Sequence, residues 1–307
     1  MKRLRSEVLR LAEMREHSDN TRLCYESDWR LFCAWCRSAG LSALPADPET
    51  LKLYVVHRLG PAEAPTAKVS TVERHIQSIV DRHMQQGRTT PYTPEVRAWM
   101  RNVRRDRGVA SEGRAALRFA DWRSIMSRLW RDRSERAVRD RAIFAIGFGG
   151  ALRRAEIIGL DVDDLKFEQR GLLLRLGRSK TDQEGKGRQA ALWIVKKPSV
   201  CPVNAVRAWL KVRGSEPGPL FPGSGGTGRL SRGSVNNAVK GRVAMIGLDP
   251  EPYGAHSLRA GFVTAAAEAG VPESVVMRQT GHRRIETVAR YYRPVSAFAV
   301  NVLAAAR

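Results

Sequence analysis

The first hundred residues carry apolar side chains at helical spacing, interrupted by short polar and glycine-containing segments. Leu31, Phe32 and Trp35 fall three to four positions apart, which places them on one face of a helix. Asp47-Pro48 and Thr93-Pro94 each pair a capping side chain with proline at the first helical position. The pattern predicts a small helical bundle. Its expected helices span 18–39, 48–59, 66–86 and 94–105.

The hydrophobic pattern changes between residues 165 and 195. The segments 172–176 and 190–195 are short apolar runs typical of strands, and the turn-rich stretch 177–187 separates them. Apolar residues recur at helical spacing over 120–131 and 135–148. The same spacing is found after residue 202, except in the glycine- and proline-rich loop 214–228. The chain is therefore predicted to be mainly α with one small antiparallel β-sheet.

A chain of 307 residues is long enough for two domains with separate cores. Residues 107–118 are small, polar and punctuated by glycine, as expected of a linker. We therefore predict a helical domain over 1–106 and a second domain over 119–307.

Charge adds information about partners. Lys and Arg number 53 against 31 Asp and Glu, a formal net charge of +22, and residues 119–307 hold 32 of the basic and 17 of the acidic side chains. Such an excess favours a polyanionic partner, because binding phosphates releases condensed counterions. Charge alone is equally compatible with a basic protein that has no nucleic-acid partner.

Membrane insertion is not expected. No apolar run approaches the roughly 20 residues that span a bilayer, and the charged start 1–5 leads into no apolar signal segment. These features predict a cytoplasmic, nucleoid-associated protein of a bacterium or phage, without a membrane partner.

The sequence offers no metal or nucleotide site. It has no Asp/Glu cluster at metal-ligand spacing and no glycine-rich loop of the Walker type. Cys33 and Cys36 have CxxC spacing but lack a second ligand pair, and Cys24 and Cys201 complete neither a zinc site nor a disulfide framework. We interpret the Cys33–Cys36 pair as helix packing and expect no cofactor.

Five side chains in the second half could together perform phosphoryl transfer. Arg153 lies in Gly-Gly-Ala-Leu-Arg-Arg-Ala-Glu, His256 and Arg259 lie in His-Ser-Leu-Arg, and Tyr291 follows His282 by nine residues. Guanidinium groups can neutralise the non-bridging oxygens of a phosphodiester, imidazoles can donate hydrogen bonds or move protons, and a phenol can attack phosphorus. This combination predicts an enzyme that cuts and rejoins DNA.

The order and spacing of these phrases resemble the catalytic domain of the tyrosine recombinases, the phage integrase family. Matching phrases extend from about Ala151 to Tyr292, and residues 1–106 are similar in length and helical pattern to the core-binding domain of Cre- and Xer-type members. The resemblance implies a helical-bundle core-binding domain followed by a catalytic domain with the DNA breaking-rejoining fold. It also implies site-specific recombination through a 3′-phosphotyrosyl intermediate and a Holliday junction.

By this resemblance Arg153 and Arg259 are the two phosphate clamps. Arginine suits that role because its planar fork donates two parallel hydrogen bonds and stays charged. His256 shares a helical face with Arg259 and could donate to a phosphate oxygen or accept the tyrosine proton. Glu156, three residues after Arg153, is expected on the same helical face, where it orients the arginine or forms a plain intrahelical ion pair.

The remaining roles also follow from the resemblance. Lys180 matches the lysine that protonates the departing 5′ oxygen, and Lys186 in the same loop is the alternative. His282 is expected to hydrogen-bond the scissile phosphate. Tyr291 is the expected nucleophile, and Tyr292 is expected to pack, because adjacent helical residues point about 100° apart.

The resemblance implies double-stranded DNA with inverted-repeat half-sites as partner, bound by a homotetramer. The apolar tail 295–307 is expected to form a helix that docks on a neighbouring protomer, with packing onto its own domain as the alternative. Two other functions remain open at this point. They are a type IB topoisomerase-like enzyme that relaxes DNA and a DNA-binding accessory protein that does not cleave.

Overall fold

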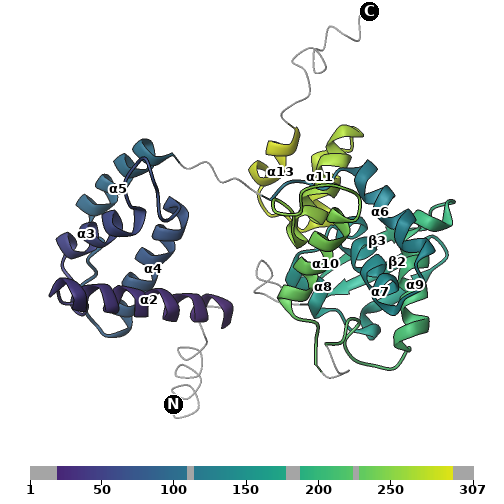
Figure 1. The fold of residues 1–307 in the computed structure, drawn as a ribbon, viewed down its shortest axis with the longest axis horizontal. Coiled ribbons are helices and arrows are strands. Elements are labelled where there is room, and N and C mark those ends of the chain that lie inside the picture. The colour runs from purple at the N-terminus through teal and green to yellow at the C-terminus, as the bar shows by residue number, and fades with distance from the viewer. Residues whose placement is uncertain (1–18, 109–113, 178–186, 224–227, 293–307) are drawn as a thin grey trace, which may run out of the picture. The chain divides into compact units, whose positions relative to one another are not determined.

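The computed structural model describes residues 19–108, 114–177, 187–223 and 228–292. The chain divides into two compact units, residues 1–112 and 113–307 (Figure 1). Within the described residues, no helix is long and apolar enough to cross a membrane. The two units have separate hydrophobic cores and are described in turn.

The first unit is a helical bundle. Its described helices are α2 (Asp19–Ala39), α3 (Pro48–Leu59), α4 (Val69–Gln85) and α5 (Pro94–Arg107). The predicted cap-proline starts are confirmed, since the side chains of Asp47 and Thr93 accept hydrogen bonds from backbone N–H groups of α3 and α5. Phe32, Tyr54 and Ile76 lie in the buried core of the bundle.

Helix α4 begins three residues later than predicted. Thr66, the expected first residue, donates its backbone N–H to Leu59 O and its hydroxyl to Arg58 O. It therefore satisfies carbonyls at the end of α3 instead of starting α4. The four cysteines are free thiols, and Cys36 packs in the core as predicted.

The second unit is mainly helical with one small sheet. Its helices are α6 (Phe119–Arg131), α7 (Glu135–Phe144), α8 (Arg154–Gly159), α9 (Pro202–Arg213), α10 (Arg232–Ala244), α11 (Ala255–Glu268), α12 (Glu273–Thr280) and α13 (Ile285–Tyr292). A π-helix, η1 (Ala145–Gly149), follows α7, and short 3-10 turns η2 (Val162–Asp164) and η3 (Pro198–Val200) complete the unit. The predicted helix 135–148 is thus α7 continued by η1.

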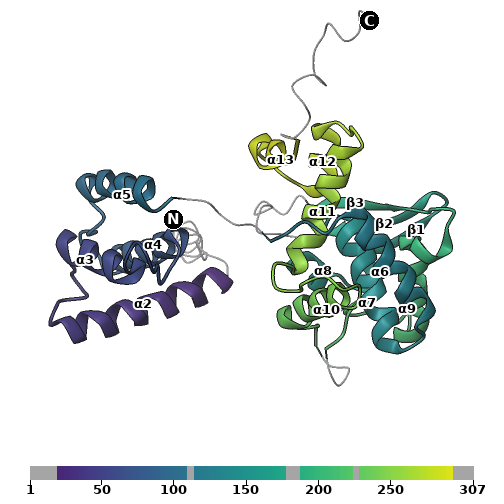
Figure 2. The ribbon, with the colours of Figure 1, turned by 45° about the horizontal axis from the view of Figure 1, so that its top comes forward.

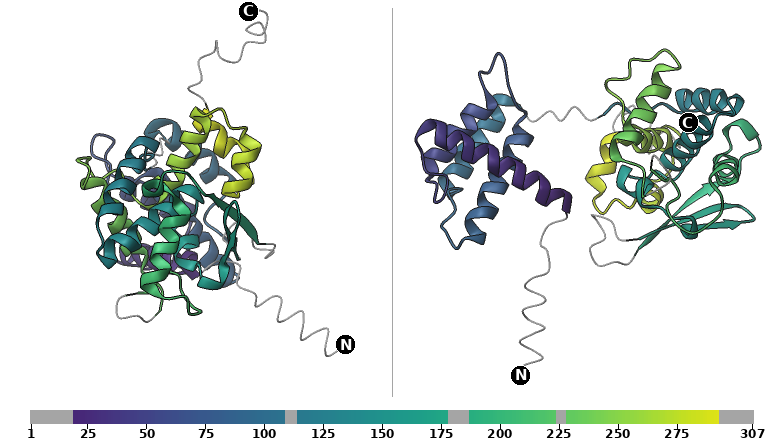
Figure 3. Two further views of the ribbon diagram at one scale, coloured as in Figure 1. Left: turned by 90° about the vertical axis from the view of Figure 1, so that its right-hand side faces the viewer. Right: turned by 60° about the horizontal axis from the view of Figure 1, so that its bottom comes forward.

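The sheet has three antiparallel strands in the order β1 (Leu165–Glu168), β2 (Gly171–Leu176) and β3 (Arg188–Trp193). Leu174 pairs with Leu165 on one side and with Ala190 on the other. Leu172, Leu174 and Leu176 are buried, since one face of the sheet packs on the unit's core (Figure 3). Strand β3 ends at Trp193, two residues earlier than predicted.

Helices α11, α12 and α13 lie side by side (Figure 2). Helix α11 also packs on the extended segment 114–118, whose Leu117 is fully buried and donates its backbone N–H to Ser257 O at 3.0 Å. Gly261 makes this approach possible, because a Cβ there would lie 2.1 Å from Leu117 O. The linker predicted over 107–118 is therefore too long, since α5 includes Arg107 and residues 114–118 belong to the second unit.

Candidate active site

Arg153 stands at the start of α8, immediately before the first helical residue. Its backbone is extended, with φ −72° and ψ 152°, so it does not share a helical face with Glu156 as expected. Glu156 instead folds back on it: Oε2 accepts the Arg153 backbone N–H at 2.7 Å, and Oε1 accepts Nη1 at 2.8 Å. One buried carboxylate thus fixes both the backbone and the guanidinium of Arg153.

The loop before Arg153 is strained. Ala151 is fully buried and has φ 51°, in the left-handed region that side chains other than glycine rarely adopt. Its carbonyl accepts a hydrogen bond from Arg259 Nη1 at 2.8 Å. Gly147 in η1 lies against α11, because a Cβ there would be 2.5 Å from Leu258 Cδ1. This close packing brings the loop onto the helix that carries Arg259.

Arg259 is only 2% exposed, and its Nη2 contacts another of the predicted site residues, His282. Nη2 donates to Nε2 of His282 at 2.9 Å, and Nδ1 of His282 is 2.7 Å from Thr280 Oγ1. Because Arg259 can only donate, Nε2 accepts and Nδ1 carries the proton. The hydrogen bonds of Thr280 are consistent with this tautomer. Its hydroxyl donates to Val276 O, so its oxygen is available to accept the Nδ1–H of His282.

The site is crowded with positive charge. Burial, followed by the charge of Arg153, lowers the pKa of Arg259 to about 9. Burial and the same arginines lower the pKa of His282 to about 4. Partial desolvation, Arg259 and Arg153 also lower the pKa of His256, although this residue keeps much of its surface in solvent. Such a cluster is suited to bind an anion, whose charge would raise these pKa values again.

Tyr291 lies on α13 and is half-buried against an apolar cluster that includes Val263 and Val288. When ionised, its phenolate would raise the pKa of the Arg259 guanidinium, a smaller effect than burial and the charge of Arg153. Hydrogen bonds therefore join the predicted residues Arg153, Glu156, Arg259 and His282 into one cluster, and the predicted His256 and Tyr291 lie on α11 and α13, which pack against each other. The backbone of Tyr292 ends α13. Lys180 and Lys186 lie outside the described residues.

Comparison with known proteins identifies the family. A model of the phage integrase family matches residues 116–297, more than half of the chain. The chain belongs to the phage integrase family. It is a tyrosine recombinase, as its motifs predicted, and its mainly helical fold with a small antiparallel sheet is the predicted one.

Individual relatives agree with this assignment. The chain is 33% identical over 295 residues to an integrase/recombinase xerD homolog of Selenomonas ruminantium, covering 93% of this chain and 85% of that protein. It is 25% identical over 287 residues to the recombinase cre of Escherichia phage P1, covering 86% and 81%. The Tn1549 transposon integrase, solved in complex with transposon right end DNA, shares the fold at a TM-score of 0.66, with 16% identity and 95% of each chain covered.

Two polar residues of this recombinase site were not predicted. Arg188 begins β3 and donates to Glu156 Oε2 at 2.8 Å and to Gln279 O at 2.6 Å. The Gln279 side chain bonds Ala191 N and O in β3 and also Gly149 O. Neither Arg188 nor Gln279 belongs to a recognisable sequence motif, and their hydrogen-bond partners lie up to 130 positions away. The sequence therefore carried no local signal for them.

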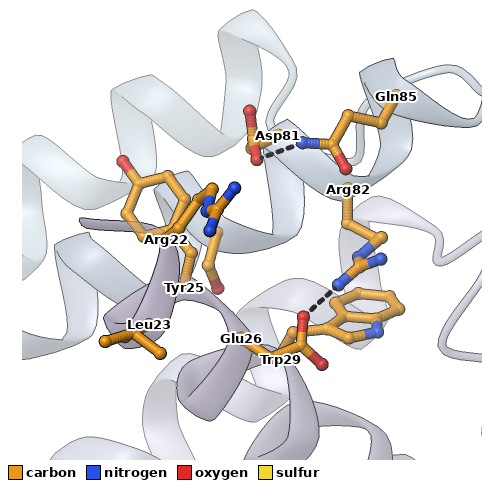
Figure 4. Close-up of a pocket in the computed structure, with 9 residues that line it drawn as sticks. Arg22, Leu23, Tyr25, Glu26, Trp29, Asp81, Arg82 and Gln85 are labelled. Carbon is orange, nitrogen blue, oxygen red and sulfur yellow. Dashed lines mark hydrogen bonds and ion pairs between the residues drawn. The ribbon is translucent and has the colours of Figure 1, made fainter. Parts of the chain in front are cut away.

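The first unit of the recombinase has a cavity of about 360 Å³ between α2 and α4 (Figure 4). Arg82 on its wall donates to Glu26 Oε2 at 2.6 Å and stacks over Trp29, and Gln85 donates to Asp81 Oδ2 at 2.7 Å. The wall thus combines basic and amide groups with two carboxylates.

Among the residues that the structure describes, no group of three or more His, Cys, Asp or Glu is arranged to hold a metal ion.

Proposed function

We propose that this recombinase cuts and rejoins DNA at specific sites through a 3′-phosphotyrosyl intermediate and a Holliday junction, using side chains alone. The observation that carries the proposal is the hydrogen-bonded cluster of Arg153, Arg259 and His282. Tyr291 lies on α13, which packs against the helix α11 that carries His256 and Arg259. A phosphodiester in this cluster would meet cationic donors and a phenol, which are the groups that transfer to a protein side chain requires.

In the proposed first step, Arg153 and Arg259 donate to the non-bridging oxygens of the scissile phosphate. Both arginines are already fixed, one by Glu156 and the other by Ala151 O and His282. Preorganised donors stabilise the charge that develops in the transition state without reorganising during the reaction. His282 contacts Arg259, so it would lie near a phosphate that Arg259 binds. Once the anion has raised the pKa of His282, the ring can donate its Nε2–H to the phosphate.

Tyr291 then attacks phosphorus through its phenolic oxygen and passes its proton to His256. The bond between phosphorus and the 5′ oxygen breaks, and Lys180 gives that oxygen a proton, leaving a free 5′-hydroxyl and a 3′-phosphotyrosine. A 5′-hydroxyl from the second duplex reverses these steps and releases the tyrosine. The phosphotyrosyl ester retains the energy of the broken bond, so that rejoining needs no nucleotide.

A nicked suicide substrate tests the chemistry, because the short strand beyond the nick diffuses away and traps the adduct. Wild-type protein is expected to form a covalent complex that Tyr291→Phe lacks while still binding the DNA. Tyr292→Phe is the matched control and is expected to form the adduct. An adduct made by Tyr291→Phe but not by Tyr292→Phe would move the nucleophile to Tyr292.

The acid is tested with a 5′-bridging sulfur substrate, whose leaving group needs no proton. Lys180→Ala is expected to cleave the sulfur substrate and not the ordinary one, with Lys186→Ala as the control. Rescue of Lys186→Ala in place of Lys180→Ala would assign the acid to Lys186.

The proposed DNA target is a duplex with inverted-repeat half-sites, bound by both units. In the first unit, Arg82 and Gln85 carry donors that suit base edges or phosphates. The relatives come from a bacterium and a bacteriophage, which supports action on DNA in a bacterial cytoplasm. Selection of binding sites from a random duplex library is expected to return an inverted repeat, and Gln85→Ala is expected to relax the preference at one position of each half.

Strand exchange is proposed to occur in a homotetramer held together by the tail 295–307, which lies outside the described residues. Deleting 296–307 is expected to leave half-site binding nearly intact and to abolish the joining of two marked duplexes. Loss of half-site binding and of monomer stability would instead assign the tail to its own domain. A wild-type protein that relaxes plasmids but never joins two duplexes would be a topoisomerase-like enzyme.

A further inference from the structure

Arg188 lies at the junction of strand β3 with helices α8 and α12, which border the candidate active site. It is the first residue of β3, and its side chain is 18% exposed. Nη2 donates to Glu156 Oε2 and Nη1 donates to the backbone carbonyl of Gln279, in the last turn of α12. One guanidinium therefore connects three elements that are far apart in the sequence.

The first connection leads to Arg153. The two carboxylate oxygens of Glu156 accept hydrogen bonds from three donors. Oε1 accepts from Arg153 Nη1, whereas Oε2 accepts from both the Arg153 backbone N–H and Arg188 Nη2. The carboxylate is 6% exposed, so water can hardly replace a lost donor. Without Arg188, the rotation of this carboxylate and the direction of the Arg153 guanidinium would be less constrained.

The second connection leads to His282. Gly281 ends α12 in the left-handed conformation, with φ 68° and ψ 37°, and its carbonyl accepts from Arg153 Nη2 at 3.5 Å. A Cβ on Gly281 would lie 2.7 Å from Arg188 Cδ, so the arginine stem packs directly on this backbone. The next residue is His282, and its position depends on where this turn is held.

We propose that Arg188 is a positioning residue that aligns Arg153 through Glu156 and His282 through the end of α12. This inference rests on the proposed roles of Arg153 and His282 in phosphate binding. The planar guanidinium of arginine presents donors in two directions, which matches a carboxylate on one side and a carbonyl on the other. Burial lowers the pKa of Arg188, and the neighbouring Glu156 opposes that shift.

The test compares Arg188→Met with Arg242→Met. Arg242 is a matched control, because its side chain is 17% exposed and donates to Asp140, a buried carboxylate between α10 and α7. For each variant, the half-site Kd and the single-turnover rate of adduct formation at saturating protein are measured. For Arg188→Met we expect a nearly unchanged Kd and a rate about 100-fold lower, since small misplacements of reacting groups cost that much. Arg242→Met is expected to react at the wild-type rate.

A wild-type rate in Arg188→Met would overturn the proposal and leave Arg188 a purely structural residue. A weaker Kd with an unchanged saturating rate would also overturn it, because Arg188 would then bind DNA directly. If Arg188→Met does not fold, Arg188→Lys decides: it keeps the charge and one donor direction, so a reduced rate is expected and a wild-type rate refutes the proposal.

A readout without DNA separates this inference from the proposed function. The imidazole ¹⁵N signals of His282 report its contact with Arg259, and they are expected to shift in Arg188→Met and to stay in place in Arg242→Met. Unmoved signals contradict the positioning role. Failure of wild-type protein to form an adduct, with the signals shifted as expected, would reject the proposed chemistry and not the positioning role.

Discussion

Arg259 donates a hydrogen bond from Nη2 to Nε2 of His282 at 2.9 Å, and this contact sets the tautomer of the histidine ring. It fixes His282 as a neutral ring that accepts at Nε2 and carries its proton on Nδ1. In this state His282 orients an arginine and cannot donate to a phosphate. A phosphate that takes over the Arg259 donor would free Nε2, so anion binding and the protonation of His282 are linked.

Thr280 holds the Nδ1–H of His282, so its hydroxyl is expected to matter for catalysis. Thr280→Val keeps the shape but leaves that N–H without its acceptor, which costs about 1–3 kcal/mol. We expect adduct formation to slow about tenfold or more, with half-site Kd little changed. Thr280→Ser retains the acceptor and is expected to react at the wild-type rate. Equal rates for the valine and serine variants would contradict the assigned tautomer.

The lowered pKa of His282 predicts acid sensitivity of the second unit. Its ordinary value is 6.5 and its folded value is about 4, because burial and then Arg259 and Arg153 disfavour the charged ring. Unfolding therefore takes up a proton, so the contribution of His282 to the free energy of unfolding is complete above pH 6.5 and is lost as the pH falls toward 4. His282→Gln is expected to flatten this fall in denaturant titrations from pH 7 to pH 4.5. If the free energy of unfolding falls equally steeply with pH in the variant and the wild type, the lowered pKa of His282 is contradicted.

Arg259→Lys is expected to retain half-site binding and lose about 10²–10³ in cleavage rate, because one ammonium cannot replace two fixed donors. Arg213→Lys is the control, since Arg213 also donates to backbone carbonyls, those that follow α9. Single-turnover adduct formation and half-site Kd are the measurements. Binding that fails together with cleavage would show that Arg259 mainly positions the protein on DNA.

The left-handed backbone of Ala151 predicts an unusual response to glycine. This conformation costs a residue with a Cβ about 1–2 kcal/mol, and glycine is free of that cost. We expect Ala151→Gly to be at least as stable as wild type in denaturant unfolding. Ala238→Gly, in the middle of helix α10, is expected to lose about 1 kcal/mol. A loss in Ala151→Gly as large as in Ala238→Gly would mean that Ala151 is not strained.

Much of the fold could be predicted from local signals. Asp47-Pro48 and Thr93-Pro94 start α3 and α5 as expected, because capping and the fixed φ of proline act within one turn. The two apolar runs around the turn-rich stretch 177–187 are the predicted strands, and the motif phrases identified the family. These properties depend on neighbours in the sequence, so the sequence alone determined them.

Other features depend on partners that the chain brings from far away. Residues 114–118 were expected to be linker, but α11 buries Leu117 where Gly261 lets the backbone approach. Arg153 was expected to share a helical face with Glu156, yet it precedes α8, and its guanidinium also donates to Gly281 O, 128 positions away. Packing and buried hydrogen bonds decided both outcomes, and neither has a periodic signature.

The candidate active site also combines features set by local sequence with features set by long-range contacts. The sequence by itself determined which residue types are available: the two arginines, the two histidines and the tyrosine. Only the tertiary structure decided that Arg188 and Gln279 join them, because their hydrogen bonds close loops of 32 to 130 residues. A carboxylate or carbonyl that is satisfied by a distant donor leaves no trace in local spacing, since the requirement arises when folding removes that group from water.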